Sequence, residues 1–340
     1  MPATPQPQDL ETGMSAAAPP KPHTEFPEER PLVTFSLIAY NQEQYIREAI
    51  EGALSQTYSP LEITLSDDCS PDGTFAIMEE LAASYEGPHK VILNRNEKNL
   101  GLARHVNVVM DMAQGEWIVF AAGDDVSLSS RVSTTMGLAS KHPTAYSIML
   151  GVNVIGSCRK KPKVINRITK FPETLQRCNG VSLGASHACR RASYIEFGPL
   201  PHNVWEDCAL GFRASLLGCV VSSTVIGVNY RIHEKSITSQ QILVSMQLPQ
   251  ICQEIAIALC MKRDLELAIE KGWVKPSAGQ KGLNELHGLL KTNKLLKEIT
   301  KCTISWRKCL LIIRLMFSVD PCRNVFWKID VLRHLKVVES

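Results

Sequence analysis

The sequence predicts an α/β fold in which a mostly parallel sheet is covered by helices on both faces. Short apolar runs rich in β-branched residues alternate with segments of helical periodicity between Leu32 and Ala121. This alternation is typical of parallel strands joined by crossover helices. Polar clusters directly follow the apolar runs, and such sheets bind ligands beyond the carboxyl ends of their strands.

Each predicted strand is followed by a predicted helix or by a polar loop. The run Leu32 to Ala39 is apolar and β-branched, as expected of a buried parallel strand. The segment Glu43 to Gln56 then places apolar residues at helical spacing. The series continues with strand Leu61 to Ser66 and helix Thr74 to Tyr85, strand Lys90 to Leu93 and helix Gly101 to Ala113, strand Trp117 to Ala121, and a strand-like run ending at Ile155.

The two ends of the chain differ from this central part. Residues 1–30 contain seven of the 19 prolines and are predicted to be a disordered leader. Residues 31–239 hold the strands and the polar clusters, and they are predicted to form one α/β domain. Residues 240–340 lack strand alternation and are predicted to form a helical, basic region, with helices at Ile251 to Lys271 and Leu283 to Phe317.

The composition is that of a globular protein, with 44% hydrophobic and 21% charged residues. A formal net charge of +3 gives no reason to expect a nucleic-acid partner. From Met261 to Ser340 there are 16 Lys or Arg against 8 Asp or Glu, so affinity for an anionic surface is expected there. The 11 cysteines form no CxxC pair, which favours the cytoplasm. No apolar stretch approaches the roughly 20 residues that cross a bilayer.

An aspartate pair follows the second predicted strand. Asp67 and Asp68 can accept hydrogen bonds from the imide of a base and from a ribose hydroxyl. The alternative is an ordinary turn, in which Asp72 or Thr74 caps the next helix. The residues alone leave both interpretations open.

A second aspartate pair, Asp124 and Asp125, follows the fourth predicted strand after Gly123. Two adjacent carboxylates repel each other unless a cation or hydrogen-bond donors compensate them. Carboxylate and diphosphate oxygens are ligands that suit Mg²⁺ or Mn²⁺. A bare Asp-Asp pair is common on surfaces, but its place at the end of a buried strand favours a metal site.

In combination, VTFSLIAYNQEQYIREAIEGALSQTY, LEITLSDDCSPDGT and NLGLARHVNVVMDMAQGEWIVFAAGDD resemble the inverting family-two glycosyltransferases of the GT-A fold, over roughly Pro31 to Ser239. The resemblance implies that Asp67 and Asp68 hold the nucleoside, and that Asp124 and Asp125 bind metal and diphosphate. Many members carry a further aspartate where this chain has Ala122. The metal shell would then rely more on phosphate oxygens.

The same resemblance assigns further residues. Asp207 matches the family's catalytic base, with Glu206 beside it, although two acids can also simply stabilise the start of a helix. Arg231 and His233 in YRIHEKSIT match a segment that contacts diphosphate or metal, although a lone histidine is more often structural.

Two further polar residues fall near the expected site. Arg104 follows Asn99 and Gly101 and can reach donor phosphates, or can lie on a solvated helix face. Asn41 ends the first strand, where it can orient the nucleotide or cap the helix that follows.

The expected activity is transfer of a sugar, with inversion, from a nucleotide-diphosphate donor to a hydroxyl acceptor. The acceptor is expected to be a glycan or a lipid-linked molecule, in cell-envelope or lipid-linked glycan synthesis. A sugar-phosphate nucleotidyltransferase and a non-catalytic sugar-nucleotide-binding protein remain alternatives. The apolar and basic tail is expected either to contact the inner face of the membrane peripherally or to pack on the protein itself.

Overall fold

The computed structural model describes residues 30–156, 164–176, 183–233, 236 and 248–301. These residues form a mixed sheet with strand order β3-β2-β1-β4-β8-β6-β9-β5, and β7 pairs with β9 away from this path. The predicted leader, the basic stretch around residues 159–163 and the chain after residue 301 lie outside the described residues. The strands are β1 (Val33–Ala39), β2 (Leu61–Asp67), β3 (Lys90–Arg95), β4 (Trp117–Ala122), β5 (Val126–Ser127), β6 (Ala145–Ile155), β7 (Arg167–Thr169), β8 (His187–Arg190) and β9 (Cys219–Arg231).

The first four strands are parallel, as predicted, and their carboxyl ends lie at one edge. β1 is the central strand, with β2 and β4 on its two sides. In this register Ala39 pairs with Asp67, and Ile38 pairs with Ala122. The two aspartate pairs, which are separated by 56 positions in the sequence, therefore start from neighbouring places on the same sheet edge.

The second half of the sheet is mixed. β8 runs antiparallel between β4 and β6, whereas β9 runs parallel to β6. β5 pairs antiparallel with β9 through Val126 and Asn229. This last pairing brings the end of β9, at Arg231, beside the loop that follows β4. The predicted α/β class is confirmed, and β8, β5 and β7 add antiparallel pairs to it.

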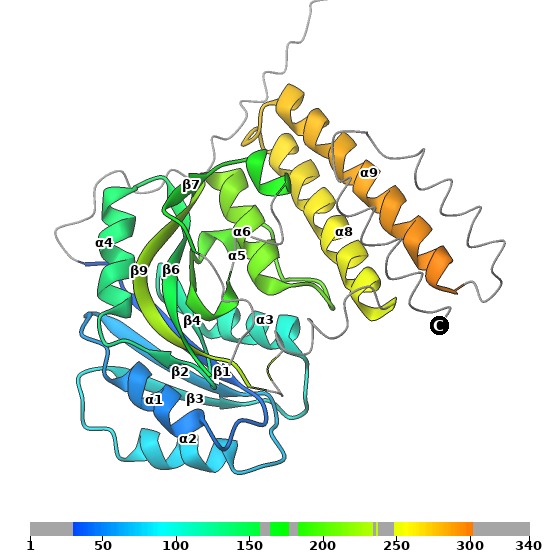
Figure 1. Cartoon of the computed structure of the whole chain (residues 1–340). Helices are drawn as coiled ribbons and strands as arrows, with labels where there is room; N and C mark the ends of the chain where they lie inside the picture. Colours follow the sequence, from blue (N-terminus) through cyan, green and yellow to red (C-terminus); the bar gives the residue numbers. More distant parts are fainter. Residues whose placement is uncertain (1–29, 157–163, 177–182, 234–235, 237–247, 302–340) are drawn as a thin grey trace, which may run out of the picture.

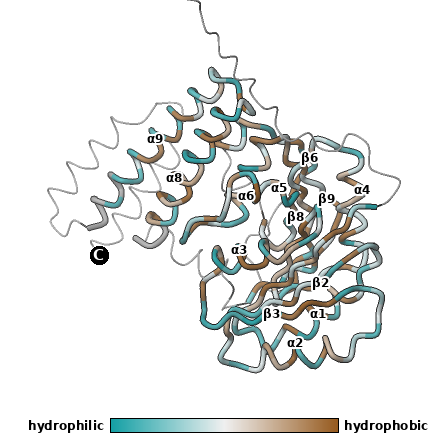
Figure 2. Tube along the Cα trace, turned by 180° about the vertical axis from the view of Figure 1, so that it is seen from behind, coloured by the Kyte–Doolittle hydropathy of each residue, from teal (hydrophilic) through white to brown (hydrophobic). Residues whose placement is uncertain are grey.

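Helices cover both faces of the sheet, and each face has its own hydrophobic cluster (Figure 1). Hydrophobic residues concentrate along the strands in Figure 2, with hydrophilic residues in the loops. One face packs against α1 (Ile46–Leu54), α2 (Thr74–Ala83) and α4 (Arg131–Lys141); the other packs against α3 (Leu102–Met112), α5 (Ala192–Ile195), α6 (Glu206–Leu217), α8 (Leu248–Glu270) and α9 (Pro276–Lys301).

The C-terminal helices α8 and α9 share the core of α6. Arg213 of α6 and Asp264 of α8 form an ion pair with 2.7 Å between Nε and Oδ2, and their side chains are 0% and 1% exposed. α9 begins at Pro276 rather than at Leu283 as predicted. Proline suits a first helical position, and Gly282 allows the close approach of Phe171 and Leu265 side chains. Tertiary packing thus extends the helix across glycines that disfavour it in isolation. Among the described residues, no helix has the length and apolar composition needed to cross a membrane.

Candidate active site

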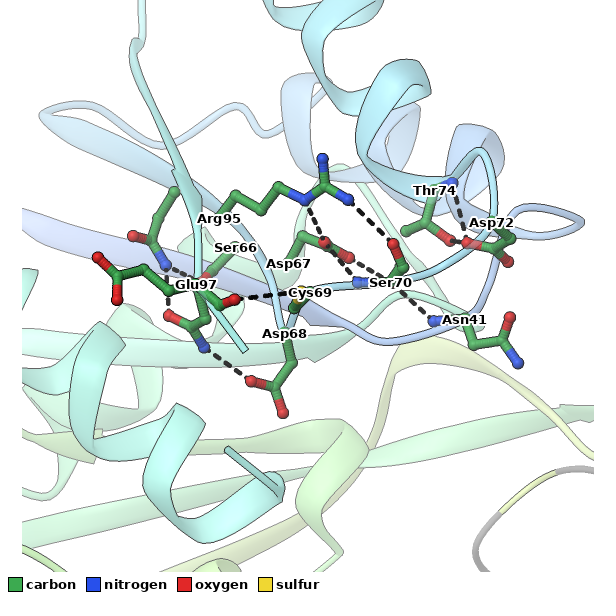
Figure 3. Close-up of polar contacts among 12 residues, drawn as sticks. Asn41, Ser66, Asp67, Asp68, Cys69, Ser70, Asp72, Thr74, Arg95 and Glu97 are labelled. Atoms are coloured by element: carbon green, nitrogen blue, oxygen red, sulfur yellow. Dashed lines mark hydrogen bonds and ion pairs between the residues drawn. The ribbon is translucent and has the colours of Figure 1, made fainter. Parts of the chain in front are cut away.

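The loop after β2 is held by a hydrogen-bond cluster around Asp67 (Figure 3). The Asp67 carboxylate is fully buried and accepts from the backbone N–H of Ser70 at 2.8 Å and from the Ser70 hydroxyl. Ser70 Oγ in turn accepts from the backbone N–H of Asn41 at 2.8 Å. Asn41 and Cys69 both have positive φ, of 56° and 62°, a conformation that side chains adopt rarely and mostly at functional sites. Asp67 thereby joins the ends of β1 and β2.

Asp68 holds a different loop, the one between β3 and α3. Its Oδ1 accepts from Asn96 Nδ2 at 2.8 Å and from the Leu100 N–H at 2.9 Å, and its Oδ2 accepts from the Gly101 N–H at 2.9 Å. The side chain is buried. Contact of Asp67 and Asp68 with a nucleoside remains a prediction, but both carboxylates also organise the loops around them.

Replacing Asp68 with Ala is expected to lower the free energy of unfolding of the ligand-free protein. Three donors would lose a charged acceptor in a buried place, at a cost of about 2 to 4 kcal/mol in unfolding free energy. Urea unfolding followed by circular dichroism measures this cost. Glu79→Ala, at an exposed position of α2, is the matched control with no expected change. Equal stability of the two variants would contradict this structural role.

The second aspartate pair lies in the loop between β4 and β5. Gly123 has no room for a side chain, because an added Cβ would lie 2.8 Å from Ala39 Cβ, which cannot move away by rotating. Asp125 is buried; its Oδ1 accepts from the Arg231 N–H at 2.7 Å, while its Oδ2 has no hydrogen-bond partner among the described residues. Burial, and secondarily the charge of Asp124, raise the pKa of Asp125 to about 8. This carboxylate is therefore under-compensated as it stands.

Arg231 and His233 meet the aspartate pair from the end of β9. His233 Nε2 lies 3.0 Å from Asp124 Oδ2, and Arg231 Nε donates to the backbone carbonyl of Asp124 at 3.0 Å. Both side chains are 17% exposed. The structure thus brings together Asp124, Asp125, Arg231 and His233, which come from two distant parts of the sequence.

This group fits a divalent cation in its chemistry. Asp124 offers a carboxylate at 14% exposure, and Asp125 has an unpaired buried oxygen with a raised pKa, a pattern that a nearby cation would compensate. Within the described part of the chain, no three or more His, Cys, Asp or Glu side chains converge in a ready metal cage. Mg²⁺ and related ions are commonly bound by one or two carboxylates with substrate phosphates completing the shell.

Glu206 and Asp207 are the first two residues of α6. Asp207 accepts from the backbone N–H of Gly184, in the 3-10 turn Gly184–Ser186 that packs on β4. Desolvation raises the pKa of Asp207, and hydrogen bonds from Cys208 and Gly184 oppose that rise. Desolvation, and then the charge of Asp207, raise the pKa of Glu206 to about 8. Burial therefore raises the pKa of both acids, and the charge of Asp207 adds to the rise at Glu206.

The structure also places the other predicted residues and adds some that the sequence did not single out. Arg104 is exposed in the first turn of α3, and its predicted contact with phosphates remains a prediction. Arg131, fully buried, donates to Ser127 Oγ at 2.9 Å and stands near Asp125. No motif marked Arg131, because its position in a helix of mixed composition looks like an ordinary surface site.

Comparison with known proteins agrees with this arrangement. Residues 34–196 match the family Glycosyl transferase family 2. EpsE of Bacillus subtilis, whose own glycosyltransferase assignment is provisional, is 37% identical over 112 residues, which cover 33% of this chain and 40% of EpsE. The Escherichia coli glucosyltransferase WfaP, described as acting on α-D-GlcNAc-diphosphoundecaprenol, is 24% identical over 66% of this chain and 87% of WfaP. The chain spans 34% to 40% of the length of the first relatives it matches.

Solved structures show the same fold at low sequence identity. TarS of S. aureus with UDP superposes with a TM-score of 0.53 at 15% identity, over 82% of this chain and 85% of TarS. The mannosyltransferase PcManGT of Pyrobaculum calidifontis, in complex with GDP-Man and Mn²⁺, gives a TM-score of 0.52 at 17% identity, over 95% and 82% of the two chains.

The fold of this chain, a half-parallel mixed sheet with helices on both faces, is therefore the GT-A fold of these two solved structures. Residues 34–196 match the glycosyl transferase family 2 model, and this part of the chain carries the parallel strands β1 to β4 and both aspartate pairs.

Proposed function

We propose that this chain transfers a sugar from a nucleotide-diphosphate donor to a hydroxyl acceptor with inversion at the anomeric carbon. One observation supports this most strongly. Within a family 2 domain, Asp124, Arg231 and His233 meet at the sheet edge, and Asp207 stands across the Gly184 turn that packs on β4. A diphosphate site at the sheet edge and a base at the start of α6 would together supply what a single displacement requires.

In this mechanism Asp207 removes the proton of the acceptor hydroxyl while that oxygen attacks the anomeric carbon. The hydrogen bond from Gly184 favours the ionised form of Asp207, against the larger effect of desolvation, and would help to orient the carboxylate. Arg231 would pair its guanidinium with phosphate oxygens of the leaving group. A bound Mg²⁺ or Mn²⁺, held by Asp124 and Asp125 with His233 nearby, would supply neutralisation of the charge that develops on the diphosphate.

The rate of transfer is expected to rise with pH through an acid limb that lies above the ordinary carboxyl pKa of about 4. A general base acts only when ionised, and desolvation raises the pKa of Asp207. The fraction of active enzyme therefore grows as pH increases through that raised value. A kcat profile between pH 4 and 9, in buffers of constant ionic strength, measures it. A profile already flat at pH 5 would contradict a base with raised pKa.

We also propose a chemical class for the acceptor. The relative WfaP is described as acting on a diphosphoundecaprenol-linked sugar, and a TuaG relative, 30% identical over 118 residues, is named for teichuronic acid biosynthesis. These names support a lipid-linked or envelope glycan as acceptor. Peripheral membrane contact by the C-terminal region, and a cytoplasmic location, remain predictions.

Donor hydrolysis tests the proposed function directly. Purified protein is incubated with UDP-glucose, UDP-GlcNAc and GDP-mannose, each with Mn²⁺ or with a chelator, and released nucleoside diphosphate is quantified. Slow, Mn²⁺-dependent hydrolysis of one donor is expected, because water replaces the missing acceptor. If the protein neither hydrolyses nor binds any of the three nucleotide sugars, the proposal is contradicted.

A further inference from the structure

The start of α1 and the residue before it contribute two side chains to the candidate site that the proposed mechanism does not use. Tyr45, just before α1, contacts Arg231 at the end of β9 and His233 just after it: the Arg231 Cζ lies 4.9 Å from its ring centroid, and the His233 ring centroid lies 4.8 Å away at an interplanar angle of 37°. Glu48, in the first turn of α1, accepts from Arg231 Nη2 at 2.8 Å. Arg231, the proposed phosphate contact, is therefore already paired with a carboxylate.

We propose that Glu48 is a displaceable counter-ion of Arg231, which releases the guanidinium when the diphosphate of the donor binds. This inference rests on the proposed function, because it takes an anionic donor to be the incoming ligand. Glu48 would then set the affinity of the site for its leaving group, by competing with donor and product for the same cation.

The donor groups of Arg231 differ in how firmly they are held. Its backbone N–H donates to Asp125 Oδ1 at 2.7 Å, and its Nε donates to the Asp124 carbonyl at 3.0 Å. Its outer Nη2 binds Glu48, whose side chain is 60% exposed. An ion pair with such an exposed partner is weak and is screened by salt. A diphosphate carries more negative charge and can accept two parallel hydrogen bonds from a guanidinium, so it wins this competition.

Tyr45 makes the exchange possible without loss of geometry. The Tyr45 ring lies against the Arg231 guanidinium. Cation–π attraction and contact area therefore hold Arg231 in position when its ion pair with Glu48 breaks. The same ring contacts His233, whose Nε2 lies against Asp124. Tyr45 is thus a positioning residue for both basic groups, and the ring rather than the hydroxyl performs this role.

The test measures binding of inorganic pyrophosphate, UDP and GDP in the presence of Mn²⁺ by isothermal titration calorimetry. Glu48→Gln is expected to bind pyrophosphate more tightly than the unaltered protein, by up to about fivefold at low salt. The gain should shrink as NaCl is raised. Glu51→Gln removes the same charge from an exposed position of the same helix and is expected to leave the affinity unchanged.

Two tyrosine variants test the positioning role. Tyr45→Leu is expected to weaken pyrophosphate binding, and Tyr45→Phe to restore it, because the ring is retained. A loss of equal size in both variants would overturn the role of the ring.

The outcomes separate this inference from the proposed function. Unchanged or weaker pyrophosphate binding by Glu48→Gln at low salt, in a protein that binds UDP or GDP, overturns the counter-ion proposal alone, and Glu48 then serves to orient Arg231 for the ligand. An unaltered protein that binds none of the three probes overturns both proposals. A tighter Glu51→Gln variant would also overturn the proposal, since the effect would then be one of general charge.

Discussion

Replacing Asp207 with Asn is expected to lower kcat by about 10²- to 10⁴-fold while donor affinity changes little. An amide is close in shape to a carboxylate and can still accept from the Gly184 N–H, but it cannot take a proton from the acceptor at neutral pH. Initial rates at saturating donor and acceptor measure kcat, and calorimetry measures donor affinity. A loss mainly in donor affinity would assign Asp207 to binding instead.

Glu206→Gln is the matched control for this variant. Burial and the charge of Asp207 raise the pKa of Glu206 to about 8, so the side chain is mostly protonated at pH 7 and its neutral amide analogue changes little. We expect this variant to keep kcat within about tenfold of the unaltered enzyme, since it retains the base. Equal losses in the two variants would show that the acids act as one unit.

Replacing Asp264 with Ala is expected to destabilise the protein by about 3 to 5 kcal/mol, because it leaves the buried Arg213 guanidinium without its counter-charge. Arg213 lies in α6, where it also donates to the Gly198 carbonyl at 2.8 Å. Asp264 lies in α8, so the pair joins the C-terminal helices to the helix that carries Asp207. Urea unfolding measures the loss, and kcat is expected to fall with it as α6 shifts.

Two further variants make this result specific. Glu266→Ala removes an acid of the same helix whose ion pair with Lys262 is exposed, and it is expected to cost no more than about 0.5 kcal/mol. The double variant Arg213→Met with Asp264→Leu replaces the pair by apolar side chains and should recover most of the stability. If Asp264→Ala is as stable as Glu266→Ala, then α8 is not anchored by this pair.

The sequence determined the elements that local pattern controls. Alternating apolar runs and helical periodicity located β1 to β4 and α1 to α3 within a few residues, because burial of a strand or one helix face imposes that period directly. The acid pairs followed from their positions after these strands. The start of α9 was predicted seven residues late, because Gly279 and Gly282 lower helix propensity and only packing explains their presence.

The tertiary structure decided which of the polar groups meet and in what state. Asp124 and Arg231 are more than 100 residues apart in the sequence, and the antiparallel pairing of β5 with β9 brings them together. The alternation of apolar residues along a strand does not specify which strand it pairs with. The pairs Glu48 with Arg231 and Arg213 with Asp264 were equally invisible, since Glu48, Arg213 and Asp264 each resemble an ordinary helix-surface charge in the sequence. Burial cannot be read from one residue's type, so the raised pKa values of Asp125 and Glu206 emerged only when the neighbouring elements were in place.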